Sequence, residues 1–333
     1  MSVDFKVFKG SDSGAIVEKS GHRDLQPTEV SIKISHCGVC GTDEHYRHAD
    51  VGLGHEGVGT ITELGSAVSQ LSDFKVGDVV GMSYHQRYCG HCKYCLKGHQ
   101  NQCPNAQFFG AANTDQGCFS TGVAWDISNL HKIPSGLDPQ YAGPLMCGGA
   151  TVWDPLYSSG AKPGDRVGII GVGGLGHLAI QFASKMGLEP IVFSSTESKK
   201  EQAKEFGAAE FHVTKDLSKL SQVEPVDVLL VTANSGLNLS TYLPVLAPGG
   251  KIYPLTVSQD SFGLSPLDLI GKSATVVGSG VAPVASIRAM LEFAAKHGVK
   301  PQIEKFPMTT DGVTEAMQKL RDGKMRYRGV LVV

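Results

Sequence analysis

The chain has 333 residues, a hydrophobic content of 41%, a charged content of 19% and a formal net charge of −2. This length predicts two domains with ample buried core, and the composition is that of a soluble globular protein. The small net charge gives no electrostatic case for binding nucleic acid or an anionic membrane. Neither a secretory signal pattern nor a membrane-spanning apolar run is visible, so we expect a cytoplasmic protein.

The first part of the chain predicts a compact β-rich domain. Residues 30–34 alternate apolar and polar side chains, which is the period of a half-buried strand. Residues 58–64 and 78–82 predict further short strands, and Gly and Pro recur up to about residue 135.

Four of the eight cysteines lie in one glycine-containing loop of this region, at spacings of three, three and eight residues: Cys89, Cys92, Cys95 and Cys103. Nested CxxC steps supply the four soft ligands that Zn²⁺ takes at tetrahedral corners. Four unrelated thiols or two disulfides are the alternatives, but a reducing compartment favours the metal. Because four thiolates leave no open position, we expect a structural zinc here and the chemistry elsewhere.

After Pro144 the pattern changes to strands alternating with helices. Strands are predicted at 166–171, 190–194, 227–232, 250–255 and 274–278, with helices at 175–186 and 198–206. This rhythm is typical of a doubly wound parallel sheet covered by helices on both faces. A further helix is predicted at 286–296, and the last strand, 329–333, could return to the first domain. We therefore expect domains at 1–145 and 146–280, with 281–333 rejoining the first.

A glycine-rich turn, Gly171-Val-Gly173-Gly174-Leu175-Gly176, follows the first of these strands and opens a helix. In this context it is the fingerprint of a dinucleotide site, although a plain glycine turn is the alternative. The glycines permit a tight turn, close approach to a pyrophosphate and close helix–strand packing. His177, in the first helical turn, is interpreted as a packing or pyrophosphate-adjacent residue.

The end of the second parallel strand bears on the choice between NAD and NADP. The chain has Ser194 and Ser195 there, followed by Lys199, where an NAD site prefers an acidic residue. A 2′-phosphate would gain hydrogen bonds from the two hydroxyls and charge from the lysine, so we favour NADP(H). A solvated helix start is the alternative, and Glu197 would be the ribose ligand if the strand ended two residues later.

Three distant segments could each supply one ligand to a second metal ion. They contain Cys40, His55 with Glu56, and Cys147. Two thiolates and one imidazole leave a fourth corner open, which is the pattern of a catalytic zinc. From the residues alone the grouping stays open, because Cys147 could be a buried thiol and His55-Glu56 a surface pair.

The CGxCGTD and GHE segments, the four-cysteine lobe, the PLMCGGAT segment and the GVGGLGH turn together resemble the zinc-dependent medium-chain alcohol dehydrogenases. The resemblance covers nearly the whole chain. It is strongest to the cinnamyl alcohol dehydrogenase branch, whose members include NADPH-dependent aldehyde reductases. It implies an α/β fold, with a GroES-like β-rich catalytic domain plus a Rossmann domain and the substrate cleft between them.

The resemblance also implies roles by matched position. Cys40, His55 and Cys147 would bind the catalytic zinc, and Glu56 would be the nearby carboxylate. Asp43 would orient the zinc-binding imidazole. Protons would pass from Thr42 through the cofactor ribose to His45 and solvent, and Thr151 would pack near the nicotinamide. Cys37 and Cys118 match no ligand position and are interpreted as buried thiols.

The implied reaction is hydride transfer between NADP(H) and an aldehyde or primary alcohol, aromatic or medium-chain, in a homodimer joined through Rossmann edge strands at 274–280. An NAD-dependent polyol dehydrogenase is one alternative, but those relatives typically carry glutamate where this chain has Cys147. A zinc-stabilised scaffold without turnover is another, which the intact relay residues oppose. One departure from the family is clear: only eleven residues separate Asp43 from His55, fewer than in most relatives. Candidate substrate walls are Phe108, Phe109, Trp125 and Val281.

Overall fold

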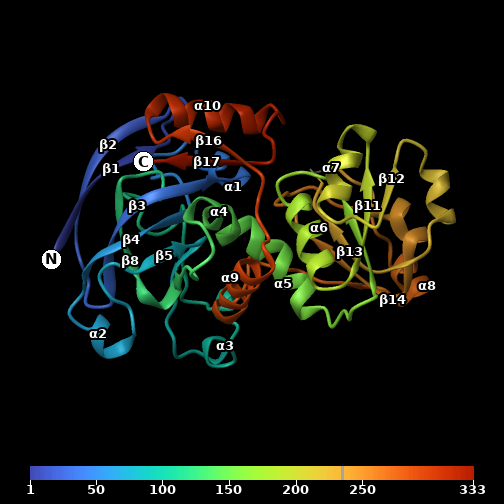
Figure 1. Cartoon of the computed structure of the whole chain (residues 1–333), viewed down its shortest axis with the longest axis horizontal. Coiled ribbons are helices and arrows are strands. Elements are labelled where there is room, and N and C mark those ends of the chain that lie inside the picture. Colours follow the sequence, from blue (N-terminus) through green and yellow to red (C-terminus); the bar gives the residue numbers. More distant parts are fainter. Residues whose placement is uncertain (234–235) are drawn as a thin grey trace. The chain divides into compact units, whose positions relative to one another are not determined.

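The computed structural model of the protein describes residues 1–233 and 236–333 (Figure 1). Two compact units divide the chain, the first made of Met1–Ala150 and Val281–Val333 and the second of Thr151–Gly280. The C-terminal segment thus belongs to the first unit. This unit also continues to Ala150, beyond the expected boundary at 145, because the π-helical turn Leu145–Gly149 lies against β4. No helix within the described residues is long and apolar enough to cross a membrane.

The first unit is built on a seven-stranded sheet in the order β16-β17-β3-β4-β5-β9, with β8 paired to β3. A hairpin of β1 and β2 and a small β6–β7 pair complete its strands. The strands are β1 Ser2–Lys9, β2 Val17–Asp24, β3 Glu29–Val39, β4 Glu56–Leu64, β5 Val79–Met82, β6 His85–Arg87, β7 Gln107–Phe108, β8 Gly122–Asp126, β9 Leu130–Lys132, β16 Ile303–Pro307 and β17 Arg328–Val332. Its helices are α1 Gly41–Glu44, α2 Val68–Leu71, α3 Lys93–Leu96, α4 Pro139–Pro144, α9 Val284–His297 and α10 Thr310–Arg321.

β3 organises this sheet, and its alternating sequence explains why. Val30, Ile32 and Ile34 are almost completely buried, whereas Lys33 between them is exposed. The strand pairs antiparallel with β4, β8 and β17, so its inward side chains enter one core shared by both segments of the unit. Figure 1 shows α10 lying along β16 and β17, with its Val313, Ala316 and Met317 in that core. The sequence interpretation did not foresee α10.

The second unit holds a six-stranded sheet in the order β12-β11-β10-β13-β14-β15, in which every pairing is parallel. The strand order reverses at β10, which pairs with β11 on one side and β13 on the other. The predicted α/β class is therefore confirmed. Its strands are β10 Arg166–Ile170, β11 Glu189–Ser194, β12 Glu210–Val213, β13 Val226–Val231, β14 Leu246–Pro254 and β15 Thr275–Val276. Its helices are α5 Ala150–Ser158, α6 Gly176–Lys185, α7 Lys200–Glu205 and α8 Pro266–Lys272.

Two elements differ from the sequence prediction in length. The helix expected at 198–206 begins as a 3₁₀ turn, Glu197–Lys199, and becomes α-helical only in α7. The edge strand expected at 274–278 is reduced to Thr275–Val276. Within the part of the chain that the structure describes, it pairs with β14 alone and forms the edge of the sheet.

Candidate functional site: two thiol-rich metal sites and a glycine turn

The four loop cysteines converge on one point. Their sulfur atoms lie within 4.8 Å of one another, with Cys89 Sγ 3.5 Å from Cys103 Sγ and 4.0 Å from Cys95 Sγ. A disulfide would require about 2.05 Å. A tetrahedral zinc with Zn–S bonds of about 2.3 Å separates its sulfurs by about 3.8 Å. The donor set therefore fits a zinc ion with four protein ligands.

The loop reaches this arrangement through its glycines and one short helix. Gly90 and Gly98 have φ values of +76° and +81°, which side-chain-bearing residues rarely adopt. Cys92 caps α3, where its sulfur accepts a hydrogen bond from the Cys95 amide at 3.5 Å. These turns thus bring four thiols from one short stretch of sequence together into a single cluster.

A second cluster gathers Cys40, His55, Glu56 and Cys147, each with one potential ligand atom within 4.8 Å of the others. Cys40 ends the loop after β3, His55 and Glu56 begin β4, and Cys147 lies in the π-helical turn after α4. All four belong to the first unit. Three segments that are distant in sequence are therefore brought together, as the resemblance implied.

Asp43 determines which imidazole nitrogen of His55 faces this cluster. Its buried carboxylate lies 2.8 Å from His55 Nδ1 and accepts hydrogen bonds from the Cys40 and Gly54 amides at 2.9 and 3.2 Å. With Nδ1–H donating to the carboxylate, Nε2 keeps its lone pair. Nε2 is fully buried and has no hydrogen-bond partner, a costly arrangement that a metal ion would satisfy.

The two thiols of the cluster influence each other directly. Hydrogen bonding from Cys147, supported by His55, lowers the pKa of Cys40, whereas the same contact and burial raise the pKa of Cys147. Of the two thiols, Cys40 is therefore the one that loses its proton first. A divalent cation displaces such protons, because thiolate is the form that binds zinc.

Arg328, which the sequence interpretation missed, holds the carboxylate of Glu56. Its Nη2 contacts both carboxylate oxygens and lies 2.5 Å from Oε2, and both side chains are buried. Burial raises the pKa of Glu56 to about 7, while the charge of Arg328 opposes this rise. No local signal could have revealed the pair, since the partners are 272 residues apart. Gly38 is required beside it, because a Cβ there would lie 2.0 Å from Glu56 Oε2.

The two predicted proton-relay residues lie on or next to α1. Thr42 is half-buried on α1, and His45, which ends that helix, is exposed.

The aromatic residues predicted as substrate walls differ in where they pack. Phe109 packs on the His55 ring at 4.8 Å between ring centroids. Trp125 is buried in the main core and donates to the Asn129 carbonyl, so it is not a substrate wall. Cys37 and Cys118 are fully buried outside both clusters.

In the second unit the glycine turn follows β10 as the sequence predicted. Gly171 has a φ of +95°, and a Cβ on Gly176 would lie 2.0 Å from the Gly171 carbonyl oxygen. These two glycines therefore make the tight turn and let α6 pack against the strand. Lys199 Nζ donates to the Val172 carbonyl at 2.6 Å, which brings its charge to the turn. The His177 side chain is buried and bonded to the Gly173 carbonyl, consistent with a packing role.

The end of β11 lies where it was predicted. The strand finishes at Ser194, whose hydroxyl donates to the Thr196 carbonyl, and Ser195 follows as an exposed residue. Glu197 is three positions beyond the strand end, exposed, and 3.9 Å from Lys200. Thr151 is half-buried at the start of α5.

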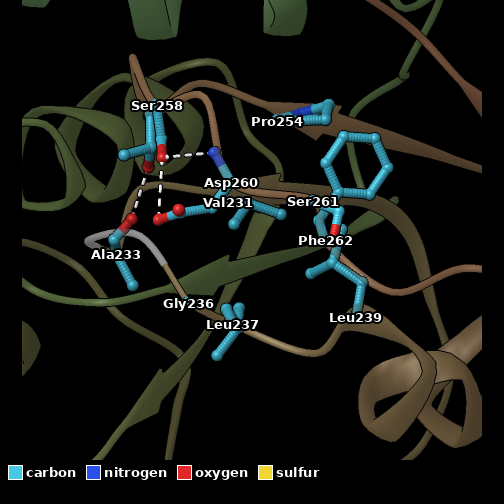
Figure 2. A pocket seen from close by; sticks show the side chains of 11 residues that line it. Val231, Ala233, Gly236, Leu237, Leu239, Pro254, Ser258, Asp260, Ser261 and Phe262 are labelled. Atoms are coloured by element: carbon cyan, nitrogen blue, oxygen red, sulfur yellow. Dashed lines mark hydrogen bonds between the residues drawn. The ribbon is translucent and has the colours of Figure 1, made fainter.

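A small cavity of about 110 Å³ lies at the carboxyl ends of β13 and β14. Figure 2 shows Ser258 and Asp260 hydrogen-bonded to each other, with Phe262 and Leu239 across from them. Ligands of parallel sheets bind at this edge, but pockets for whole cofactors measure about 300–1,000 Å³. The cavity alone therefore cannot enclose a dinucleotide.

Comparison with known proteins agrees with this geometry. Residues 26–135 match the alcohol dehydrogenase GroES-like domain, and residues 174–296 match the zinc-binding dehydrogenase domain. The chain is 35% identical to the aldehyde reductase AdhA of Synechocystis, over 92% of each protein. It is 34% identical to the probable cinnamyl alcohol dehydrogenase 8D of Oryza sativa, covering 92% of this chain and 88% of that one.

Solved structures give the same result. A cinnamyl alcohol dehydrogenase from Sorghum bicolor aligns with a TM-score of 0.90 and 31% identity, over 100% of this chain and 98% of that one. The Helicobacter pylori enzyme, solved with NADP(H), aligns with a TM-score of 0.88 and 27% identity, over 100% and 99%. With both domain models matched and metal-ligand clusters in place, the chain belongs to the zinc-binding alcohol dehydrogenases, in their cinnamyl alcohol dehydrogenase-like branch.

Proposed function

We propose that this protein is an NADP(H)-dependent aldehyde reductase that uses one catalytic and one structural zinc ion, with aromatic or medium-chain aldehydes as substrates. The observation that carries the proposal is the buried, unpartnered Nε2 of His55 beside the sulfurs of Cys40 and Cys147. Three such ligands leave a fourth position for the substrate oxygen. When bound, zinc supplies Lewis acidity toward the carbonyl oxygen and the reduced nicotinamide supplies hydride.

The surrounding residues hold this site in its reactive form. Asp43 keeps the His55 imidazole in the tautomer whose Nε2 can act as a ligand. Arg328 holds the Glu56 carboxylate near the ligand atoms and compensates its negative charge. The near-complete burial of His55 and Glu56 excludes bulk water from this side of the site.

A proton must reach the substrate oxygen as hydride reaches the carbon. The Thr42 hydroxyl donates it in the proposed mechanism, since Thr42 is on the short helix α1, whose N-cap residue is Cys40. His45, exposed at the end of α1, exchanges the proton with solvent.

The preference for NADP(H) over NAD(H) is the finer part of the proposal. The strand end is hydroxylic and not acidic, and Lys199 is held at the glycine turn. A 2′-phosphate would gain charge-assisted hydrogen bonds from this environment, while the ribose diol of NAD would find no carboxylate at the strand end.

The test is the initial rate of NADPH and NADH oxidation with cinnamaldehyde and a short aliphatic aldehyde, in protein whose zinc content is measured. Two zinc ions per chain and turnover with NADPH that a chelator stops would support the proposal. Cys147→Ser should abolish turnover and retain the fold, whereas the matched variant Cys37→Ser, at a buried thiol outside both clusters, should remain active. Full activity in Cys147→Ser would overturn the assignment, and a single zinc with no turnover would favour a scaffold.

We also propose that the protein is a cytoplasmic homodimer formed through the second unit. β15 is the edge of its sheet, and Leu267 and Ile270 on the neighbouring α8 are 76% and 73% exposed. An unpaired edge flanked by apolar side chains is suited to pairing with a second copy. Light scattering of the purified protein tests this, and Ile270→Glu should shift it to the monomer.

A further inference from the structure

A hollow of about 150 Å³ lies in the first unit, and none of the residues that line it is a candidate metal ligand. Three parts of the chain form its walls: the turn between β1 and β2, the segment that follows α1, and α10. They contribute Ala15 with Ile16, Arg47, and Met317 with Arg321, respectively. One water molecule occupies about 30 Å³ in the liquid, so the hollow has room for a ligand of about five or six non-hydrogen atoms.

The lining combines apolar side chains with two arginines. Ile16 and Met317 are 8% and 1% exposed, so they form the buried part of the hollow. Arg47 and Arg321 come from opposite ends of the sequence and line the same space. A few charged groups set among apolar side chains are the usual composition of a small-molecule site. Here both charged groups are cations, so the lining is suited to a ligand with an anionic head and a short apolar chain.

Arg321 is held in place and its charge is balanced. Its Nη1 donates to both carboxylate oxygens of Glu44, at 2.8 and 2.7 Å, and its Nη2 donates to the side-chain oxygen of Gln318 at 2.5 Å. The side chains of Arg321 and Glu44 are only 26% and 16% exposed. A guanidinium has five N–H donors, and these contacts occupy at most three of them. Arg321 therefore keeps donors for a ligand without giving up its ion pair.

Arg47 has no such balance. Within residues 1–233 and 236–333, its half-buried side chain makes neither an ion pair nor a hydrogen bond. Its backbone is nevertheless fixed, because its carbonyl accepts a hydrogen bond from the Ser11 amide at 3.0 Å and its amide donates to the Glu44 carbonyl at 3.3 Å. Since Glu44 offsets Arg321, the charge of Arg47 is left over at the hollow. A guanidinium without a counter-ion in a partly dry setting attracts an anion.

We propose that this hollow is a binding site for a small aliphatic carboxylate, held by Arg47 and Arg321, with its chain against Ile16 and Met317. The planar fork of arginine matches the two oxygens of a carboxylate, and the size of the hollow limits the chain to about four carbons. Arg47 lies in the shortened segment before His55, so this site uses the part of the chain that departs from the relatives. The inference goes beyond the proposed reductase function and does not depend on it.

The experiment is calorimetry of the zinc-loaded protein at low ionic strength, with butyrate as the probe and butyramide as its neutral counterpart of the same shape. Butyrate should bind with a dissociation constant of about 1 mM, which is reasonable for a ligand of this size. Butyramide should show no measurable binding, because it lacks the charge that the arginines recognise. Inorganic phosphate should bind more weakly than butyrate, because it has no chain to cover the apolar side chains.

Two variants locate the binding site. Arg47→Gln should weaken butyrate binding at least tenfold, since it removes the unbalanced charge. Ala15→Phe keeps both arginines but fills the hollow, and it should abolish binding. Arg288→Gln, at an exposed arginine of α9 in the same unit, is the matched control and should bind butyrate within about twofold of the wild type. Melting curves of each variant confirm that it is folded.

The outcomes are decisive in either direction. Wild-type protein that does not bind butyrate, or equal binding by the wild type, Arg47→Gln and Ala15→Phe, would overturn the proposal. Phosphate or butyramide binding as tightly as butyrate would overturn the carboxylate class. All of these measurements are made without turnover, so they succeed or fail independently of the reductase assignment.

Discussion

Replacing Arg328 with methionine tests the buried ion pair behind the candidate catalytic cluster. The change keeps an apolar stem and removes the guanidinium, so Glu56 loses its charged partner. Glu56 is completely buried and the Arg328 side chain is 6% exposed, so water cannot replace the lost donors. Breaking such a pair costs about 3–5 kcal/mol, and we expect the first unit to lose this much unfolding free energy.

The magnitude is large enough to measure without ambiguity. For a unit of about 200 residues, each kcal/mol shifts the Tm by about 2–4 °C, so the expected fall is about 6–20 °C. The chain has two tryptophans, Trp125 in the first unit and Trp153 in the second. In a Trp153→Phe background, the buried Trp125 is the only tryptophan left, so its fluorescence during urea unfolding reports on the first unit.

The matched control is Arg23→Met, because Arg23 pairs with Asp115, whose side chain is 56% exposed. A solvent-screened pair of this kind contributes about 0–1 kcal/mol. Adding Glu56→Gln to Arg328→Met should recover part of the loss, since it removes the uncompensated charge. If Arg328→Met lowered the unfolding free energy no more than Arg23→Met at equal zinc content, the reasoning about burial would be refuted.

Three further outcomes are expected. Cys95→Ser should lose one zinc ion and lower the Tm, whereas Cys118→Ser should keep both zinc ions. If Cys95→Ser retained two zinc ions, the assignment of a structural zinc site to this loop would be refuted. Ser195→Asp should lower kcat/KM with NADPH at least tenfold and raise it with NADH, because a carboxylate repels the 2′-phosphate; an unaltered ratio would mean that the strand end does not select the cofactor. Burial lowers the pKa of His131 to about 3, so the unfolded state takes up the proton first as pH falls below about 6.5. Stability should therefore fall by about 1.4 kcal/mol between pH 7.5 and 5.5, and His131→Gln should flatten that slope in urea titrations; an identical slope would exclude His131 as its source.

Much of the fold could be predicted because its signals are local. The strand predicted at 30–34 lies within β3, although Ser31 is buried along with its apolar neighbours, and the strand–glycine turn–helix pattern at 166–186 matched β10 and α6 within a residue or two. The four-cysteine loop was equally readable, since its ligands lie within fifteen residues. Where packing decides the length of an element, prediction was weaker: edge strand β15 is two residues long, and α10 was missed although its apolar face is regular.

The residue types and spacings by themselves determined that this chain carries a four-thiol metal loop, a dinucleotide turn and a hydroxylic strand end. Cys40, His55 and Cys147 were grouped only through resemblance, because nothing local links side chains on three separate segments. The tertiary structure alone revealed the Arg328–Glu56 pair and Tyr84 beside His55, whereas the orienting role of Asp43 had been expected from the resemblance and is matched by its 2.8 Å contact with His55 Nδ1. These depend on β17 returning to pair with β3 and on loops meeting across the sheet. Contacts of that kind arise from the burial of a shared core, which no short stretch of sequence encodes.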